Sequence, residues 1–422
     1  MKKSSKDMFP IGLMVFSTFF GAGNLIFPPY LGMMGGTKWF IAFLGFIIGD
    51  VLLAVLAVIG TCKYDEISTG VLLRCGRKFA VVLSGISMLC VGPFLAIPRT
   101  GSVTFEISIL PNLPQASRVL FAVIFFGVTL FLTLHSSKVV DILGKALTPL
   151  LLIALVVFIV RGIVSPLGAI QADAKIRGVF SNGLMQGYQT LDAVGGSITG
   201  ILVIVSIMGR GYKDYKERLD IATKSSILAF ILLVLVYGGL AYLGATVSAQ
   251  YTPDVDQTTL LVQIASGLFG QTGKIVLEIL VLLACLTTSV GLTSAVANYF
   301  TELTKGKLHY PVLCTAIAAF SGIMSLLGVQ KIISLAVPIL LVMAPVFATI
   351  IIFSVFSDKI KNNHVFQFGA YMALACGLLS VFKVPFMNSL PLSNLGFNWV
   401  IPTAVAAIAG HFVCVKEPAL KR

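Results

Sequence analysis

Two glycine-rich interruptions within apolar stretches hold the residues best suited to bind a small polar solute. The first runs from Gly21 to Asn24 and divides the apolar residues 9–31. Glycines leave the backbone uncovered, and an uncovered amide or carbonyl inside a membrane costs several kcal/mol unless protein, water or an ion satisfies it. At ~1.5 Å per helical residue, Gly21 lies roughly 18 Å into a hydrocarbon core of about 30 Å. A helix broken near the midplane is typical of the substrate site of a secondary transporter.

The second interruption, residues 187–196, carries polar side chains between its glycines. Thr190 and Asp192 lie there, at a depth similar to that of the first break. An acid inside a membrane is costly and by default indicates function. Asp192 could therefore meet a cation or a substrate ammonium, or accept a proton. The alternative is a hydrogen-bonded structural carboxylate.

Asn24 and its neighbouring glycines also allow two interpretations. The side-chain amide of Asn24 could bind an ion or a substrate carboxylate beside the positive end of a half-helix. Alternatively, Asn24 makes an interhelical hydrogen bond, and the glycines are close-packing contacts between helices. The matched depth of the two breaks favours a binding site.

A third polar segment, residues 284–289, is suited to a hard cation. Ala284, Thr287 and Thr288 share one helical face because positions i, i+3 and i+4 align. Two hydroxyls beside a carbonyl suit sodium, which prefers several oxygen ligands, and the carbonyls of Ser17 and Phe20 in an unwound first helix could complete the shell. The alternative is that the hydroxyls bond back to the preceding turn or join helices.

Four further charged residues within apolar segments are candidates for a role. For Asp50, Glu106 and Glu278 the default is a structural role, because the sequence does not fix their depth or face. Arg99 could pair with an acid in an outer vestibule, or extend its charge to the interface. Arg99 and Glu106 are therefore a candidate gate or ion pair.

The elements that must position these residues are transmembrane helices. Apolar residues make up 57% and charged residues 11% of the 422 residues, and the mean hydropathy is +0.98. We therefore expect a single transmembrane domain over residues 1–422. Windows of about 20 residues predict an all-α protein with twelve transmembrane helices, at residues 9–31, 39–60, 79–110, 119–134, 139–160, 179–208, 221–247, 274–299, 311–327, 332–356, 365–381 and 398–415. The first of these is too long to be a cleaved signal peptide.

The distribution of positive charge predicts the orientation. Most of the 30 lysines and arginines fall in loops on the same side as the two termini. Because such loops remain in the cytoplasm, both termini are predicted to be cytoplasmic in a multi-pass protein of the cell membrane. The net charge of +13 then reflects orientation and contact with anionic membrane lipids, and no nucleic acid partner is expected.

The two breaks are five helices apart, so helices one and six run in opposite directions. This is typical of an inverted-topology repeat with discontinuous helices one and six. We expect residues 9–160 and 179–356 to form the two repeats and residues 365–415 to form two accessory helices. Residues 250–269 form an outer loop long enough for a short helical lid.

Other functional classes lack their signatures. The seven cysteines form no CxxC pair or ligand cluster, so neither a disulfide framework nor a metal site is expected, and no cofactor is expected. The sequence has no HExxH motif, nucleophile elbow or phosphate-binding loop, so an enzyme is not expected. A pore would need a ring of repeated filter elements, whereas this chain has two inequivalent breaks.

Three stretches resemble the branched-chain amino acid:cation symporter family, the BrnQ-type carriers of the LIVCS family, and the resemblance covers essentially the whole chain. They are Phe19-Phe20-Gly21-Ala22-Gly23-Asn24-Leu25-Ile26-Phe27-Pro28-Pro29, Gly92-Pro93-Phe94-Leu95-Ala96-Ile97-Pro98-Arg99-Thr100 and Leu283-Ala284-Cys285-Leu286-Thr287-Thr288. The resemblance implies import of L-leucine, L-isoleucine and L-valine across a bacterial cytoplasmic membrane. It implies sodium, or alternatively protons, as the coupling ion.

More distantly, the chain resembles the leucine-transporter fold of the amino acid-polyamine-organocation superfamily. That fold carries a Gly-X-Gly-Asn break in its first helix and an Ala-Gly-Leu-Thr-Ser ion motif in its eighth. The resemblance implies a sodium site at Ser17, Phe20, Ala284, Thr287 and Thr288 and a substrate site at Phe19, Gly21, Ala22, Gly23, Asn24, Thr190 and Asp192. Asn24 and Thr190 would also mark a second sodium site. The sequence departs from the fold at Cys285 and Asp192.

The function expected from these features is sodium-coupled symport of branched-chain amino acids by alternating access. An aliphatic side chain offers no hydrogen bond, so discrimination among the three substrates should be modest, about 1–3 kcal/mol per methylene. The alternatives are proton coupling, a broader range of hydrophobic amino acids, or a sensor that binds amino acids without moving them.

Overall fold

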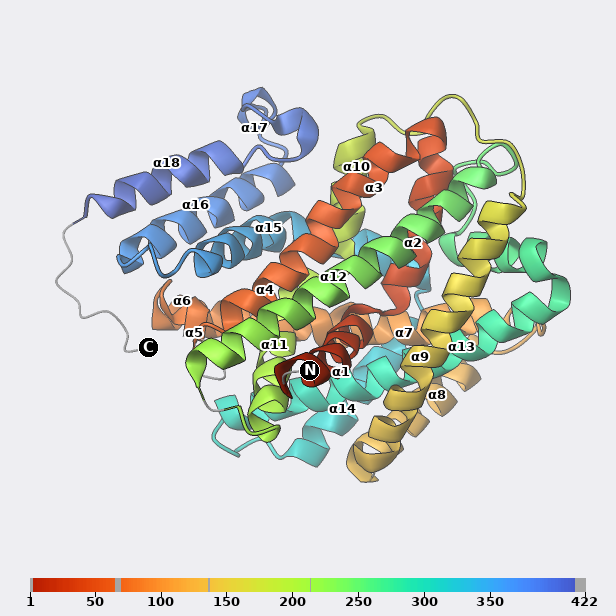
Figure 1. The fold of residues 1–422 in the computed structure, drawn as a ribbon, viewed down its shortest axis with the longest axis horizontal. Coiled ribbons are helices and arrows are strands. Elements are labelled where there is room, and N and C mark those ends of the chain that lie inside the picture. The colour runs from red at the N-terminus through yellow and green to blue at the C-terminus, as the bar shows by residue number, and fades with distance from the viewer. Residues whose placement is uncertain (1–2, 65–69, 136, 213, 414–422) are drawn as a thin grey trace.

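The computed structural model describes residues 3–64, 70–135, 137–212 and 214–413, and the regular structure in these ranges is helical (Figure 1). The elements are α1 (Lys3–Phe19), α2 (Ala22–Gly35), η1 (Gly36–Lys38), α3 (Trp39–Ile47), η2 (Ile48–Leu52), α4 (Leu53–Thr61), α5 (Gly70–Leu73), α6 (Arg77–Leu89), η3 (Cys90–Phe94), α7 (Ala96–Thr104), η4 (Phe105–Ile109), α8 (Arg118–His135), α9 (Ser137–Val164), α10 (Val179–Gln189), α11 (Asp192–Gly209), α12 (Tyr215–Thr246), α13 (Gln257–Leu303), α14 (Tyr310–Ser325), α15 (Val329–Val355), α16 (Asn363–Val381), α17 (Phe386–Ser389), η5 (Ser393–Leu395) and α18 (Val400–His411).

Many of these helices are suited to a membrane. Within the described ranges, eight helical stretches are long and apolar enough to cross one, and shorter apolar helices lie at Asp7–Phe19, Pro149–Val164, Tyr310–Ser325 and Val400–His411. These helices confirm the all-α class with several candidate spans. The count of twelve, the inverted repeat and the domain boundaries stay predictions. The last predicted span reaches residues 414–415, which lie outside the described residues.

The structure breaks the first predicted span at the start of the first glycine-rich segment and the sixth within the second. α1 ends at Phe19 and α2 begins at Ala22, so Phe20 and Gly21 lie outside both helices. α10 ends at Gln189 and α11 begins at Asp192. Between them, Leu191 has a φ of 72°, which a leucine rarely adopts. Backbone strain of this kind, roughly 1–3 kcal/mol, is concentrated at functional sites.

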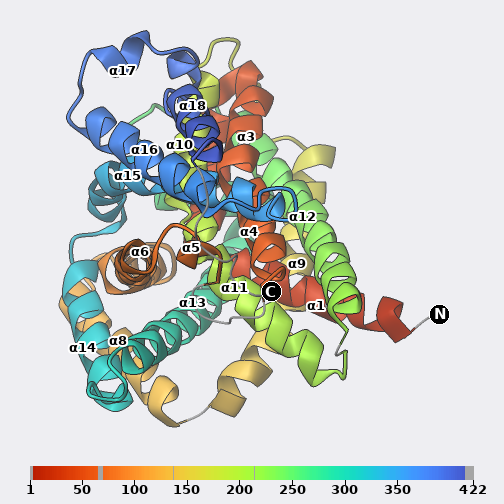
Figure 2. The ribbon, with the colours of Figure 1, turned by 90° about the vertical axis from the view of Figure 1, so that its left-hand side faces the viewer.

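The broken helices pack with α3, α4 and α12 into a group that we call the core bundle. A second group, α7, α8, α13 and α14, packs beside it (Figure 2), and α16 lies between α15 and α18 (Figure 1). Glycines bring the backbones of the core bundle close together. A Cβ at Gly244 of α12 would overlap the carbonyl oxygen of Pro29, and one at Gly32 would overlap that of Ala241. Small residues are the usual means of close helix contact in membranes.

We expect Gly244→Ala to lower the yield of folded protein severalfold, because the added methyl group cannot fit against Pro29 without parting α2 from α12. The measurement is size-exclusion chromatography of a fluorescent fusion in detergent. Gly127→Ala in α8 is the matched control, since a Cβ there meets nothing within 4 Å. Equal monodisperse yields for both variants would contradict the prediction.

Two features of the helices differ from the predicted spans. The predicted span at residues 274–299 is part of the longer α13. This helix includes residues 257–269 of the predicted lid segment and kinks at Gly270, where φ is 59°. Three π-helical segments, η2, η3 and η4, interrupt the second and third spans. A π-helical turn widens the helix locally and frequently marks a functional site. Asp50 lies in η2 and Glu106 in η4.

Candidate functional site

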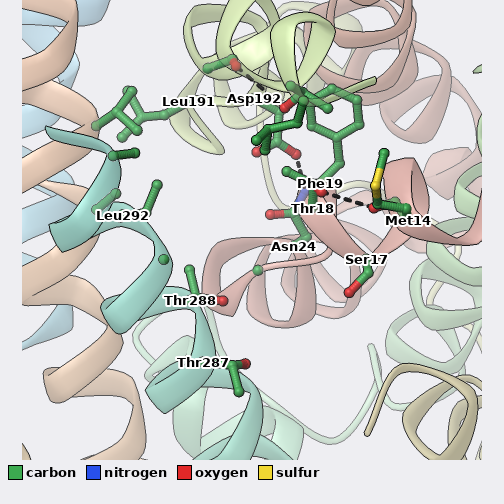
Figure 3. Close-up of a pocket in the computed structure, with 18 of the residues that line it drawn as sticks. Met14, Ser17, Thr18, Phe19, Asn24, Leu191, Asp192, Thr287, Thr288 and Leu292 are labelled. Carbon is green, nitrogen blue, oxygen red and sulfur yellow. Dashed lines mark hydrogen bonds between the residues drawn. The ribbon is translucent and has the colours of Figure 1, made fainter. Parts of the chain in front are cut away.

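A cavity of about 840 Å³ lies where the two helix breaks face α13 (Figure 3). This volume is within the range of roughly 300–1,000 Å³ typical of small-molecule sites. Most of the predicted site residues line it, namely Ser17, Phe19, Gly21, Ala22, Asn24, Arg99, Thr190, Asp192, Thr287 and Thr288. Phe20, Gly23, Ala284 and Glu106 are described by the structure but are not part of the lining.

Hydrogen bonds join the two breaks through an acid of the second span. Asn24 Nδ2 donates to Asp192 Oδ2 at 2.8 Å and to Asp50 Oδ2 at 3.2 Å. Thr190 Oγ1 donates to Asp50 Oδ1 at 2.8 Å. Asn24 thus makes interhelical hydrogen bonds, as one interpretation of the sequence expected. It also lines the cavity, as the other interpretation, a binding site, requires.

Arg99 holds the end of α10. Its Nη1 donates to the carbonyl of Gln189 at 2.6 Å and its Nη2 to that of Thr190 at 3.1 Å. These carbonyls lie at the negative end of the helix dipole, where a cation is stabilising. The guanidinium also lies 5.6 Å from the centroid of the Phe27 ring. A Cβ at Gly23 would lie 2.9 Å from Arg99 Nη2, so Gly23 gives the guanidinium its space instead of lining the cavity.

The structure does not form the predicted pair between Arg99 and Glu106. Glu106 accepts instead from Arg118 Nη1 at 3.1 Å, from Thr258 Oγ1 at 3.0 Å and from the amide of Val329 at 3.2 Å. The reason is their separation along one helical span: Arg99 in α7 is level with the second break, whereas Glu106 in η4 meets the beginnings of α8, α13 and α15. Glu106 therefore joins helix ends away from the cavity.

The proposed cation ligands lie on two facing helices. Figure 3 shows Thr287 and Thr288 on α13 along one wall and Ser17 on α1 across from them. Thr287 Oγ1 donates to the carbonyl of Ala284 at 3.0 Å. This is the hydrogen bond to the preceding turn that was expected from the sequence as the alternative to a cation site. At the end of α1, the amide of Gly21 donates to the carbonyl of Phe19 at 3.1 Å. In a continuous α-helix it would donate to the carbonyl of Ser17 instead. The backbone therefore unwinds at the residues predicted to supply carbonyl ligands.

The cavity extends from the breaks toward the beginning of α1. Leu13 and Met14 of α1 line one side, and Ser206 of α11 and Arg210, which directly follows α11, line the other. At this end Arg210 Nη1 pairs with Asp7 Oδ1 at 2.6 Å. In the opposite direction, the hydrogen bonds of Asn24 and Arg99 join the helices around the breaks. The lining of the cavity thus reaches the N-terminal half of α1.

Asp50, for which the default expectation from the sequence was a structural role, contacts residues that line the cavity. Its side chain is 0% exposed, and it accepts hydrogen bonds from both broken helices. The available signal was an acid within an apolar span, preceded by Gly49. That signal could not show which helices surround the acid, because their contacts come from residues far apart in the chain.

Comparison with known proteins identifies the family of this chain. The family model for Branched-chain amino acid transport protein matches residues 4–417. Branched-chain amino acid permease BrnQ of Bacillus subtilis (strain 168) is 33% identical, over 98% of this chain and 98% of that protein. Branched-chain amino acid permease BraB of the same organism is 35% identical, over 96% of this chain and 95% of that protein.

Solved structures share the fold at low identity. Mhp1 in its inward-facing conformation superposes with a TM-score of 0.61 at 13% identity, over 96% of this chain and 90% of that chain. MhsT in complex with L-phenylalanine gives 0.57 at 16% identity, over 95% and 97% of the two chains. The apolar helices and the family together place the protein in the cell membrane as a multi-pass protein. The chain belongs to the branched-chain amino acid transport protein family, whose members are permeases and not enzymes.

Proposed function

We propose that this chain is a secondary active symporter that imports leucine, isoleucine and valine together with sodium by alternating access. The observation that carries the proposal is that two broken helices bring Asn24, Thr190 and Asp192 to one cavity, with Thr287 and Thr288 facing them. The permease names of the relatives suggest the substrate class.

The cavity offers a partner for each part of an amino-acid zwitterion. The partly exposed carboxyl group of Asp192 suits the ammonium group. The backbone amides at the beginning of α2, next to Gly21, suit the carboxylate because a helix N-terminus carries partial positive charge. Apolar lining residues such as Val91, Leu191 and Leu292 suit a branched aliphatic side chain.

Sodium would bind between the core bundle and α13. Its ligands would be the hydroxyls of Thr287 and Thr288 and the carbonyls of Ser17, Phe20 and Ala284. An ion bound by both the core bundle and α13 stabilises one arrangement of these two parts relative to another. Coupling of ion and substrate transport requires such a difference. If both termini are cytoplasmic, as the charge distribution predicts, a cavity that reaches from the breaks toward the beginning of α1 would correspond to the inward-facing state, in which ion and substrate leave.

We expect Thr288→Ala to raise the sodium concentration for half-maximal leucine uptake at least tenfold, because loss of one oxygen ligand costs roughly 1.5 kcal/mol or more. The measurement is uptake of radiolabelled leucine into proteoliposomes under an inward sodium gradient. Thr315→Ala is the control, since Thr315 in α14 is exposed and its hydroxyl bonds back to Pro311. Competition by valine and isoleucine tests the substrate class.

Other outcomes of the same assay identify the alternatives. Accumulation driven by a proton gradient alone and indifferent to Thr288 would move coupling to Asp192. Equal competition by phenylalanine or methionine would indicate a broader range of hydrophobic substrates. Leucine binding without any flux would make the protein a sensor and would overturn the proposed function.

A further inference from the structure

Asp50 is a buried acid whose surroundings are specific. It lies in η2, the π-helical segment of the second span, with an exposed fraction of 0%. A buried carboxyl group is costly unless hydrogen bonds compensate it, and an apolar residue of similar size would avoid that cost. A residue of this kind inside a membrane protein indicates a role in the site that it contacts.

The backbone of α10 lies directly against η2 and fixes the position of Asp50. A Cβ at Gly187 would lie 2.9 Å from the amide nitrogen of Asp50, and one at Gly49 would lie 2.5 Å from the carbonyl oxygen of Leu184. Glycines on both sides thus permit the close approach. The carboxyl group therefore has a defined place beside the end of α10.

From this place Asp50 contacts both helix breaks. Its Oδ1 accepts from Thr190 Oγ1 at 2.8 Å, and its Oδ2 accepts from Asn24 Nδ2 at 3.2 Å. The carbonyl of Thr190 accepts from Arg99. Thr190 is therefore held from two directions, by Asp50 through its hydroxyl and by Arg99 through its backbone.

The contact with Asp50 also sets the orientation of Asn24. One N–H of its amide is directed to Asp50 and the other to Asp192, at 2.8 Å. Because the amide group is planar, its oxygen must point the opposite way. Asn24 Oδ1 indeed lies 3.7 Å from a Cβ position at Gly21, which lines the cavity. The amide oxygen is thereby presented at the first break.

We propose that Asp50 is a positioning residue of the carrier, which ties the two helix breaks together and holds Thr190 and Asn24 in the geometry that binds substrate. The inference rests on the proposed transport function and deepens it. Asp50 positions Thr190 and Asn24 through hydrogen bonds, it is also hydrogen-bonded to Asp192, and it does not line the cavity itself.

The test compares two substitutions that differ in hydrogen bonding. In Asp50→Asn, the new amide oxygen can accept from Asn24 and the new amide nitrogen can donate to the Thr190 hydroxyl. The Thr190 hydroxyl can then donate to the carbonyl of Gly187, which lies 2.7 Å away. Asp50→Leu can make neither bond. We expect Asp50→Leu to raise the KM for leucine at least ~tenfold with a smaller change in Vmax, because misplaced binding groups weaken binding. Asp50→Asn should keep the KM within about threefold of the wild type.

Controls separate this inference from the proposed function and from folding. Wild-type uptake in the same proteoliposomes tests the function itself. Glu278→Gln alters another buried acid, whose Oε2 accepts from Asn112 away from the cavity, and it should leave the KM unchanged. If Asp50→Leu fails to fold, Thr190→Val removes the same contact from the other side and should raise the KM similarly. A wild-type KM in Asp50→Leu or Thr190→Val, or a folded Asp50→Asn as impaired as Asp50→Leu, would overturn the inference.

Discussion

Asp192→Asn is expected to abolish leucine accumulation in proteoliposomes while the protein stays folded. Asparagine has the same shape and can still accept the hydrogen bond that Asn24 Nδ2 makes to Asp192 at 2.8 Å. It lacks the negative charge that we assign to the substrate ammonium. Hydrogen bonds to charged groups contribute about 1.5–3 kcal/mol, so loss of the charge should weaken leucine binding roughly 10- to 150-fold.

The measurement has two parts, equilibrium binding of radiolabelled leucine in detergent and uptake under a sodium gradient. Asp220→Asn is the matched control, because Asp220 in α12 is exposed and pairs with Lys224 in the same helix. Asp192→Glu keeps the charge but lengthens the side chain, so we expect intermediate binding. Wild-type affinity in Asp192→Asn would show that the ammonium binds elsewhere.

The parts of this site that depend on local sequence were predictable. A glycine pair in an apolar span weakens a helix wherever the span packs. α1 ends at Phe19, just before the first glycine-rich segment, and α10 ends at Gln189, within the second. Likewise, helical periodicity places Thr287 and Thr288 toward one side of α13, and both line the cavity. These features need no knowledge of neighbouring helices.

The parts that depend on packing between distant segments were not predictable from one sequence. Arg99 meets the carbonyls of Gln189 and Thr190, which lie about 90 positions further along the chain. The sequence does not reveal which backbone carbonyls a side chain meets, so the two expectations for Arg99 were an acid partner or a position at the membrane interface. The role of Asp50 depended similarly on the approach of α10 through Gly187. No residue pattern in the sequence predicted the π-helical segment η2, which contains Asp50.

Arg99→Gln is expected to destabilise the protein and abolish transport. Arg99 is 6% exposed, and its guanidinium donates to two carbonyls at the end of α10 and interacts electrostatically with Asp192 and Asp50. Removing one partner from such a buried charged group typically costs about 3–5 kcal/mol, because the remaining groups stay buried without compensation. The measurement is the melting temperature in detergent together with leucine uptake. Arg177→Gln, on an exposed loop residue, is the control and should change neither.

Two further variants identify what Arg99 contributes. Arg99→Lys keeps the charge but loses the planar fork that reaches two carbonyls at once, so we expect a folded protein with slow uptake. Combining Arg99→Gln with Asp50→Asn removes a positive and a negative group together. If the two interact as the structure indicates, the double variant should be more stable than the sum of the single effects allows, since groups in one network are not additive. If the stability losses of the two single variants simply add, Arg99 stabilises the protein only through its hydrogen bonds to the carbonyls of α10. The proposed electrostatic interaction between Arg99 and Asp50 would then be wrong.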